Sequence, residues 1–367
     1  MTPVIHFVTG GGSGATKVAI DLACGNLRNG IYVPLLVLRR KRVALPAPMQ
    51  AQIDSARLAV RWVDPSPKRR TLRQLAAIID EYGPQIFVAH GNSEHIWGRQ
   101  AAFRAKVPVV IHIEQNCERY PFWRRWSARA LATQTSSTVC VSRGVANHIR
   151  ALELAGPRVD IIHNGIDSIR FSIGAPPLTE RSQDVIMVAR FARQKDQQTL
   201  IRAARRLVDS GWTGNLLLGG GGKASHRQAA EKLVDRLRIR DRVRFLGQVN
   251  DAAPLYHQCR AAVLSTHYEG IPLVLIDYMA AGCAAVASLA PGTDDVITDG
   301  VNGWLFPGGD DAALAKLLMN VLAAGPAVQA IVARAQADAP ANFSLQKMIA
   351  RYEALFDELL KNPPAAH

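Results

Sequence analysis

The stretch Glu269-Gly270-Ile271-Pro272-Leu273-Val274-Leu275-Ile276-Asp277 sets two carboxylates eight positions apart. A strand-like run at residues 261–264 precedes it, and the small residues Ala280-Ala281-Gly282 follow it. Proline is tolerated at the first position of a helix, and glycine suits the position just past a helix end. The stretch therefore predicts a strand, a turn that carries Glu269 and a helix that carries Asp277. Both acids then contact one long polar ligand, or Asp277 is simply a solvated helix residue.

The same alternation of strands and helices runs along the whole chain and predicts parallel sheets covered by helices. Strands are expected at residues 4–9, 33–38, 58–63, 86–89, 107–113, 138–141, 159–162, 184–188, 215–218, 243–246, 261–264, 284–287 and 304–306. Helices are expected at residues 16–29, 72–82, 96–106, 126–134, 197–210, 225–237, 252–258, 272–281, 312–323 and 344–360.

The alternation breaks near residues 171–182, where glycine, proline and serine are frequent. This stretch is the best candidate for a linker between an N-terminal domain, residues 1–172, and a C-terminal domain, residues 173–343. Both are predicted to be α/β, doubly wound and Rossmann-like. Ligands of such sheets bind beyond the carboxyl ends of the strands, so we expect the site in a cleft between the domains. The amphipathic helix expected at residues 344–360 fits either domain.

Composition places the chain among soluble globular enzymes. Of its 367 residues, 48% are hydrophobic and 20% are charged, and no apolar run approaches the length of a membrane span. The five cysteines are far apart, which favours neither a zinc site nor a disulfide framework. The N-terminus lacks a basic leader and is expected to form a first strand. We therefore expect a cytoplasmic protein.

The net charge of +14 is unevenly distributed. Residues 1–172 carry 23 Lys and Arg against 11 Asp and Glu, whereas the remaining residues carry 21 against 19. A basic first half attracts phosphates, nucleic acid or an anionic membrane. The alternative is a solvated basic surface that has no partner.

Further short motifs occur in a fixed order. They are Ser13–Lys17, Val141–Val145, His163–Asp167, Ala189–Phe191 with Lys195-Asp196, Gly219–Gly222, Val243–Gly247 and Asp299–Gly303. Together with Glu269–Asp277, this order resembles family 4 of the retaining glycosyltransferases, which have the two-domain GT-B fold. The resemblance extends from about residue 9 to residue 306. It implies that the final helix crosses back to the N-terminal domain.

The resemblance implies a site for a UDP- or GDP-linked sugar donor. Glu269 then lies beside the donor sugar, as a nucleophile or as a stabiliser. Arg190 and Lys195 neutralise the departing diphosphate, a task that fixed cations and helix N-termini can perform without a metal. The chain has no Asp-x-Asp motif, and we expect neither a metal nor a cofactor. Asp277 stands where the family has a second Glu, which holds the ribose hydroxyls.

Further donor contacts are implied on both domains. Glycine lets backbone amides approach a phosphate closely, although the loop of residues 10–14 also fits a flexible turn. It matches neither the dinucleotide-binding pattern nor a P-loop. The implied donor contacts are Gly14, Gly247, Gly270, Ile271 and Leu273.

The N-terminal domain departs from the family pattern at one position. The family places a His after the strand of residues 107–113, and here Gln115 fits that position best, with His112 inside the strand. An amide then forms the hydrogen bond to the donor sugar. Alternatively, Glu114 and Gln115 are loop residues on the acceptor side. His90 is a further acceptor-side candidate, although a lone His at a strand end is more often structural.

The segment Arg119–Trp126 interleaves aromatic residues with arginines. Trp and Tyr favour the bilayer interface and arginines favour anionic headgroups, but a platform for single-stranded nucleic acid uses the same residue types. A partly buried loop is the third interpretation. We favour membrane contact, because the implied enzyme acts on a glycan or lipid-linked acceptor.

The chain is therefore predicted to be a retaining, metal-independent glycosyltransferase of bacterial cell-envelope polysaccharide or lipopolysaccharide synthesis. It would work in the cytoplasm, at the inner face of the cytoplasmic membrane, with no nucleic-acid partner. One alternative is a basic nucleic-acid-binding α/β protein, which the positive charge of residues 1–172 would explain. The other is a GT-B protein that binds its donor but transfers nothing.

Overall fold

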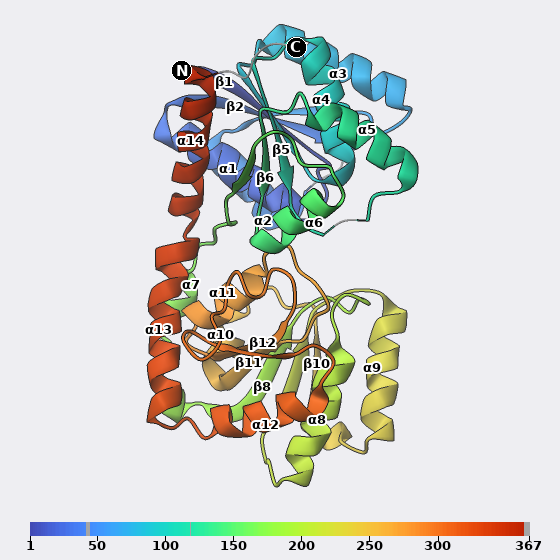
Figure 1. The fold of residues 1–367 in the computed structure, drawn as a ribbon. Coiled ribbons are helices and arrows are strands. Elements are labelled where there is room, and N and C mark those ends of the chain that lie inside the picture. The colour runs from blue at the N-terminus through green and yellow to red at the C-terminus, as the bar shows by residue number, and fades with distance from the viewer. Residues whose placement is uncertain (42–44, 118, 363–367) are drawn as a thin grey trace. The chain divides into compact units, whose positions relative to one another are not determined.

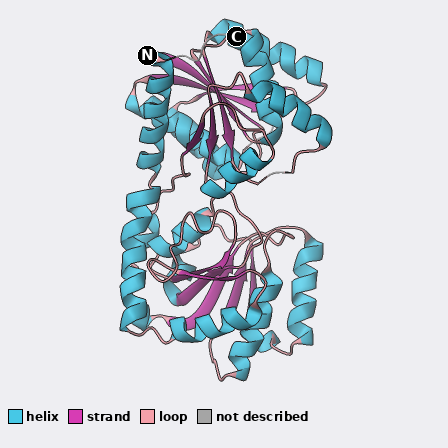
Figure 2. Ribbon diagram, in the orientation of Figure 1, coloured by secondary structure: helices cyan, strands magenta, loops and turns pink. Residues whose placement is uncertain are grey.

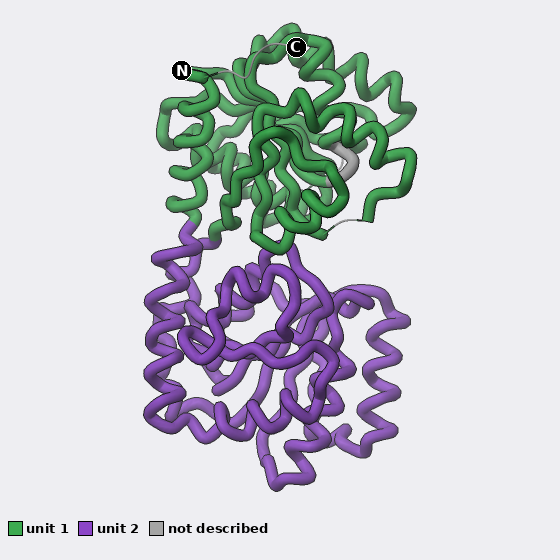
Figure 3. The backbone as a smooth tube through the Cα atoms, in the orientation of Figure 1, with its two compact units in different colours: residues 1–165, 345–367 green, residues 166–344 purple. Residues whose placement is uncertain are grey.

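The computed structural model describes residues 1–41, 45–117 and 119–362. The chain forms two compact units, Met1–Gly165 with Leu345–His367 and Ile166–Ser344 (Figure 3). The first break falls after residue 165 and not after residue 172, where the linker composition suggested it. The reason is that helix α7 (Ile169–Ser172) packs within the second unit, where the Phe171 carbonyl accepts a hydrogen bond from His257 Nε2 at 2.7 Å.

The first unit is a seven-stranded parallel sheet covered by helices (Figures 1 and 2). Its strand order is β3-β2-β1-β4-β5-β6-β7. The strands are β1 (Thr2–Val8), β2 (Tyr32–Arg39), β3 (Ala59–Val63), β4 (Ile86–His90), β5 (Val109–Glu114), β6 (Ser137–Cys140) and β7 (Val159–Ile161). The helices are α1 (Gly14–Asn29), α2 (Ala47–Ala56), α3 (Lys68–Tyr82), α4 (Asn92–Arg104), α5 (Phe122–Ala132), α6 (Arg143–Ala151) and α14 (Leu345–Lys361).

The second unit is a six-stranded parallel sheet of order β10-β9-β8-β11-β12-β13 (Figure 2). Its strands are β8 (Ser182–Val188), β9 (Leu216–Gly219), β10 (Val243–Gly247), β11 (Cys259–Leu264), β12 (Ala284–Leu289) and β13 (Trp304–Pro307). Besides α7, its α-helices are α8 (Gln197–Asp209), α9 (Ala224–Arg236), α10 (Ala253–Gln258), α11 (Leu273–Ala280), α12 (Asp311–Leu322) and α13 (Pro326–Phe343). Two single 3-10 turns lie at Leu178–Glu180 and Arg240–Arg242.

Helix α14 packs against α1 of the first unit. The carboxylate of Glu353 accepts hydrogen bonds from Asn26 Nδ2 and Asn29 Nδ2, each at 2.9 Å. Gly25 faces Ile349, and any larger residue at position 25 would collide with that side chain. The amphipathic pattern of residues 344–360 left the partner of this helix open. The structure shows that this partner is α1, whose polar side chains bond Glu353 and whose Gly25 leaves room for Ile349.

Each predicted strand run overlaps a strand of the structure, and the predicted α/β class with two Rossmann-like sheets is confirmed. The central strands β4 and β5 are buried along their whole length, as expected of parallel strands covered on both faces. Four of the described α-helices were missed, namely the single-turn helix α7 and the longer helices α2, α6 and α13. Helix α7 is four residues long, α2 buries only Ile53, α6 is nine residues long, and α13 contains Pro340. None of them therefore shows a long uninterrupted apolar stripe.

Within the described ranges, no single helix is long and apolar enough to cross a membrane. The pair α12 and α13, which is bent by 95°, meets the length and composition test only when both helices are taken together.

Four histidines are buried beside the carboxyl ends of the central strands of the first unit. His6 Nδ1 lies 3.2 Å from His90 Nε2, and the rings of His95 and His112 stack with centroids 4.1 Å apart. Burial lowers the pKa of all four imidazoles, that of His6 to about 4. These histidines are therefore neutral in the folded protein near pH 7.

A buried arginine determines the tautomer of one of them. Arg99 donates from Nη1 to Thr135 Oγ1 at 2.7 Å and from Nε to the His95 carbonyl at 3.1 Å. Its Nη2 lies 2.7 Å from His95 Nδ1. A guanidinium only donates, so Nδ1 is the acceptor and the proton of His95 is on Nε2.

The buried histidines predict that stability falls as the pH decreases from about 6.5. Below that pH the unfolded chain binds protons at positions where the folded protein does not, because the folded-state pKa values are depressed. For His6 alone the loss at pH 5 is about 2 kcal/mol. Urea unfolding at pH 8, 6.5 and 5 measures it. His90→Asn should weaken the pH dependence, whereas the exposed-site variant His267→Asn should not. An equal slope in the wild type and His90→Asn would contradict this account.

Candidate functional site

Glu269 lies in the loop between β11 and α11. Its backbone N–H donates to the Pro291 carbonyl at 2.9 Å, which joins this loop to the one after β12. Gly292 makes the close approach possible, because its φ is +86° and any side chain there would collide with the Gly270 carbonyl. The sequence analysis missed Gly292. The Pro291-Gly292 pair is a turn signal that would have placed a tight loop here.

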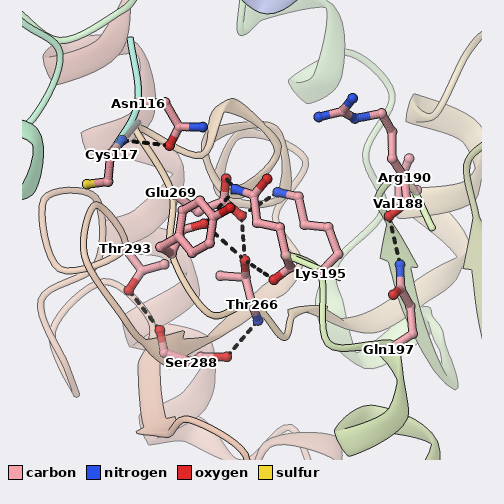
Figure 4. A network of polar contacts seen from close by, with 12 residues as sticks. Asn116, Cys117, Val188, Arg190, Lys195, Gln197, Thr266, Glu269, Ser288 and Thr293 are labelled. Carbon is pink, nitrogen blue, oxygen red and sulfur yellow. Dashed lines mark hydrogen bonds and ion pairs between the residues drawn. The ribbon is translucent and has the colours of Figure 1, made fainter. Parts of the chain in front are cut away.

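Three side chains hold the Glu269 carboxylate (Figure 4). Oε1 accepts hydrogen bonds from Lys195 Nζ and, at 2.8 Å, from Thr266 Oγ1. Oε2 accepts a longer bond from Gln194 Nε2 at 3.3 Å. The Lys195 and Glu269 side chains are only 13% and 9% exposed, so the ion pair is largely withdrawn from water.

Backbone pairing brings these side chains together. Lys195 forms an antiparallel bridge with Thr266, the Asp196 N–H donates to the Ser265 carbonyl at 3.0 Å, and the His267 N–H donates to the Gln194 carbonyl at 2.9 Å. The loop after β8 and the loop after β11 are thus tied along three residues each. Lys195 and Glu269 were both predicted, and the structure places them in contact. Thr266 and Gln194 carry no sequence signal and were missed.

Arg190 is not part of this cluster. Its backbone carbonyl accepts a hydrogen bond from Gln197 Nε2 at 3.0 Å, and its guanidinium extends apart from the Lys195–Glu269 pair (Figure 4). The side chain is exposed, and within the described ranges it forms no ion pair. Arg190 therefore keeps a charge that is not neutralised by a neighbouring carboxylate. Its predicted contact with a diphosphate stays a prediction.

Asp277 lies inside α11, as expected. Burial raises the pKa of its carboxyl group to about 7, and the nearby Arg170 guanidinium opposes that rise. No hydrogen bond to its side chain occurs among the described residues. An uncompensated buried carboxylate costs stability unless a ligand supplies donors. The predicted contact of Asp277 with ribose hydroxyls stays a prediction.

The start of α11 differs by one residue from the prediction. Pro272 is the N-cap and Leu273 the first helical residue, with Gly270 and Ile271 buried just before them. At the other predicted glycines, Gly247 ends β10 with φ of +70° and its carbonyl accepts a bond from Gly220 N–H at 2.6 Å.

On the first unit, Gly14 is the exposed first residue of α1, whose N-cap is Ser13. Donor contacts at all of the predicted glycines, at Ile271 and at Leu273 stay predictions.

The remaining predicted residues lie in the first unit, where His90 ends β4, Glu114 ends β5 and Gln115 follows β5. Gln115 Oε1 accepts a hydrogen bond from Asn164 Nδ2 at 2.9 Å. Glu114 and His90 are fully buried, and Glu114 accepts hydrogen bonds from the Tyr120 hydroxyl and, at 3.2 Å, from the Gln115 N–H. Neither His90 nor Glu114 reaches solvent here, so acceptor contact by either one requires a rearrangement and stays a prediction.

The described parts of the chain bring no three His, Cys, Asp or Glu side chains together in a way that would hold a metal ion. The strongest charges of the site in the second unit are those of Lys195, Glu269, Arg190 and Asp277. This arrangement offers two cations to an anionic ligand and two carboxylates to hydroxyl groups.

Two family models match the chain one after the other. Residues 12–170 match Glycosyltransferase Family 4, and residues 169–338 match Glycosyl transferases group 1. The chain therefore belongs to the group 1 glycosyltransferases, of the family 4 type, and the predicted resemblance is confirmed.

Curated relatives are similar over part of their length. The chain is 30% identical over 241 residues to the D-inositol 3-phosphate glycosyltransferase of Mycolicibacterium vanbaalenii. The matched region covers 60% of this chain and 53% of that protein. It is 24% identical over 281 residues to the amylovoran biosynthesis glycosyltransferase AmsK of Erwinia amylovora, which covers 74% of this chain and 63% of that protein. The chain thus spans between half and two thirds of the length of these relatives.

Among solved structures, HepE from Anabaena in complex with UDP-glucose has a TM-score of 0.85 at 19% sequence identity. The match covers 98% of this chain and all of that one. The predicted GT-B fold is confirmed.

Asp277→Asn should stabilise the protein at alkaline pH and weaken nucleotide binding. The folded-state pKa of Asp277 lies above its ordinary value, so the group favours the folded state at low pH and loses that contribution as the pH rises toward 7. At pH 8 the amide removes a partly buried charge and should raise the free energy of unfolding by about 4 kcal/mol, since each unit of the pKa rise corresponds to about 1.4 kcal/mol.

Thermal and urea unfolding at pH 5 and 8 measure this change. The gain should be smaller at pH 5 than at pH 8, because Asp277 of the folded protein is protonated at pH 5, and it should vanish only below about pH 3.8, where the unfolded chain is protonated as well. Asp80→Asn, at an exposed position of α3, is the control for the change in charge. Equal destabilisation of Asp277→Asn at both pH values would contradict the account.

Proposed function

We propose that this protein is a retaining glycosyltransferase that moves a sugar from a nucleotide-diphosphate donor to a hydroxyl group of a glycan or lipid-linked acceptor. The observation that carries the proposal is the largely buried Lys195–Glu269 pair. It lies on the loops after β8 and β11, beyond the carboxyl ends of two neighbouring strands, where α/β sheets bind their ligands.

The cations of the site would stabilise the leaving group. The negative charge that develops on a departing nucleoside diphosphate is met by Lys195 Nζ and by the exposed Arg190 guanidinium. Free amide N–H groups at the start of α11 add donors. In this proposal no metal ion and no further cofactor take part. Lys195 would exchange part of its contact with Glu269 for a phosphate oxygen.

Glu269 would act on the sugar as a stabiliser. Its carboxylate accepts hydrogen bonds from Lys195, Thr266 and Gln194. Such bonds stabilise the carboxylate and make it a weaker nucleophile. A carboxylate in this position instead accepts hydrogen bonds from sugar hydroxyls and favours the positive charge of an oxocarbenium-like transition state. The leaving phosphate oxygen would take the proton of the acceptor hydroxyl. The acceptor oxygen then bonds to the sugar carbon on the face from which the phosphate departs, so the configuration at that carbon is retained.

Asp277 would hold the ribose of the donor, which is UDP- or GDP-linked in this proposal. UDP-glucose is the ligand that the HepE structure holds, and AmsK is named as an amylovoran biosynthesis glycosyltransferase. These names support a uridine donor and a role in envelope polysaccharide synthesis.

Lys195→Met and Glu269→Gln should each lower the turnover number for sugar transfer by roughly 100-fold or more, because each removes a charge that faces the transition state. A thermal-shift series with UDP-, GDP- and ADP-linked sugars first identifies the donor, since a ligand stabilises the protein according to its concentration and affinity. Transfer and donor hydrolysis are then measured with that donor. Arg205→Ala, at a position of α8 that is paired with Asp209 and not with the site residues, is the control. Full transfer by both variants, with the fold intact, would overturn the proposal.

A membrane contact through α5 is part of the same proposal, and it places the enzyme at the inner face of the cytoplasmic membrane. Phe122, Trp123 and Trp126 are 77%, 72% and 72% exposed. The helix has no acidic residue, and Arg124 and Arg129 are exposed beside the aromatic side chains. Aromatic rings enter the bilayer interface while arginines meet anionic headgroups, so the surface of α5 suits an anionic lipid surface.

The triple variant Phe122→Ser, Trp123→Ser, Trp126→Ser should bind anionic vesicles at least roughly tenfold more weakly, because it removes three large apolar groups from the interface. Flotation with vesicles of phosphatidylcholine and phosphatidylglycerol measures binding, and pure phosphatidylcholine tests the charge dependence. Met319→Ser, at an exposed position of α12, is the control. Unchanged flotation of the triple variant would reject the contact. Wild-type binding to a single-stranded oligonucleotide, with no binding to vesicles, would favour nucleic acid instead.

A further inference from the structure

The two oxygens of the Glu269 carboxylate are held unequally. Oε1 accepts hydrogen bonds from two donors, Lys195 Nζ and Thr266 Oγ1, the second at 2.8 Å (Figure 4). Among the described residues Oε2 accepts only the bond from Gln194 Nε2, at 3.3 Å. The same amide nitrogen has a shorter bond, at 2.6 Å, to the Tyr268 carbonyl, so its hold on Oε2 is weak. Oε1 is therefore the fixed oxygen of the carboxylate, and Oε2 is the one that can change its partner.

The Thr266 hydroxyl has a single proton and three acceptors within reach. Besides Glu269 Oε1 at 2.8 Å, the carbonyl oxygens of Gln194 and Tyr268 lie at 3.1 and 3.3 Å. Each carbonyl already accepts another bond, from the His267 N–H at 2.9 Å and from Gln194 Nε2 at 2.6 Å, respectively. A hydrogen bond to a charged acceptor is about twice as strong as one to a neutral acceptor. The proton of Thr266 is therefore directed to Oε1.

We propose that Thr266 is a positioning residue that fixes Oε1 of Glu269 and thereby leaves Oε2 to the donor sugar, an inference that rests on the proposed function. In the proposed reaction Lys195 transfers part of its contact to a phosphate oxygen, and Thr266 is then the donor that still holds Oε1. A carboxylate held at one oxygen presents its other oxygen in a fixed direction. Oε2 exchanges its long bond from Gln194 for a contact with the sugar, where positive charge develops.

The loop after β12 anchors the Thr266–Glu269 contact. The Thr266 N–H donates to Ser288 Oγ at 2.8 Å, and the Glu269 N–H donates to the Pro291 carbonyl at 2.9 Å. Thr293 Oγ1 lies 2.7 Å from the Ser288 carbonyl and closes this loop on itself (Figure 4). Thr266 is only 1% exposed. Both ends of the contact are thus attached to one loop, and the hydroxyl has little freedom to turn away from the carboxylate.

Three variants at the two donors test the assignment. Thr266→Val keeps the shape of the side chain and removes the donor to Oε1, whereas Thr266→Ser keeps that donor. Gln194→Met keeps the length of the side chain and removes the donor to Oε2. Thr71→Val is the matched control. Thr71 is a fully buried threonine of α3 in the first unit, and its hydroxyl donates to the Asp64 carbonyl.

The kinetic measurement follows release of the nucleoside diphosphate from UDP-glucose, GDP-glucose and ADP-glucose, without an acceptor. With the donor that the wild type cleaves fastest, Thr266→Val should lower kcat about tenfold or more and change KM less than about threefold, because Glu269 acts on charge that exists only in the transition state. Thr266→Ser should keep kcat within about threefold of the wild type. Gln194→Met should lower kcat less than about threefold, and Thr71→Val less than about twofold.

A double-mutant cycle separates positioning from a general structural effect. In the Glu269→Gln background the charge that Thr266 orients is gone, so the addition of Thr266→Val should lower kcat less than about twofold further. A residue that only supports the fold would cause the same loss in both backgrounds, because its effect does not pass through the carboxylate.

Unchanged kcat in Thr266→Val, an equal loss in Thr71→Val or an equal loss in both Glu269 backgrounds would overturn the proposal. A loss in Gln194→Met as large as that in Thr266→Val would overturn the assignment of Oε2 to the sugar. Circular dichroism melting shows whether each variant folds, and Thr266→Ala replaces Thr266→Val in the same series if the latter does not fold.

The outcome for the wild type and for Glu269→Gln distinguishes this inference from the proposed function. If the wild type cleaves a donor and Glu269→Gln does not, whereas Thr266→Val is fully active, the positioning role of Thr266 fails alone. If the wild type neither binds nor cleaves any of the three donors, the proposed function fails together with it.

Discussion

The short backbone pairing between residues 194–196 and 265–267 is the constraint on which the site of the second unit depends. It ties two loops that leave neighbouring parallel strands at the same edge of the sheet. Because these loops are tied, the Lys195 side chain is only 13% exposed and lies in contact with the Glu269 carboxylate. Truncating either partner would leave a largely buried charge unpaired, which typically costs 3–5 kcal/mol. The pair is therefore already formed before any ligand arrives, which suits a site that must meet charge as it develops.

Both units keep buried polar groups that weaken the fold. In the second unit Asp277 is a carboxylate whose raised pKa reflects burial without a partner. In the first unit four neutral histidines and the guanidinium of Arg99 lie among apolar strands. Gln115 Nε2 and Asn164 Oδ1 are two further buried atoms that have no hydrogen-bond partner in the part of the chain that the structure describes. Such groups are expected where ligands bind, because a binding site retains polar atoms that the fold itself does not satisfy.

Sequence reasoning succeeded where a local pattern reports a local structure. The apolar runs located every strand, and Pro272 with Gly282 placed a helix around Asp277 with an error of one residue at its start. It failed where short-range signals are weak, as in α2, with one buried residue, and α13, which contains Pro340. It also missed Thr266, Gln194 and Asn164. Their roles come from contacts with residues distant in sequence, and single residues of these types are common in loops.

The sequence by itself determined the fold class, because strand and helix periodicity and parallel alternation are local properties of the chain. The sequence also identified the family, because the short motifs and their order along the chain can be recognised without knowing how the chain folds. Only the tertiary structure decided that Lys195 contacts Glu269, that Arg190 stays apart, and that His90 and Glu114 are buried. It also decided that α14 packs on α1, because Gly25 and two asparagines leave room and partners for it. Side-chain distances follow from packing between elements, and no single stretch of sequence contains that information.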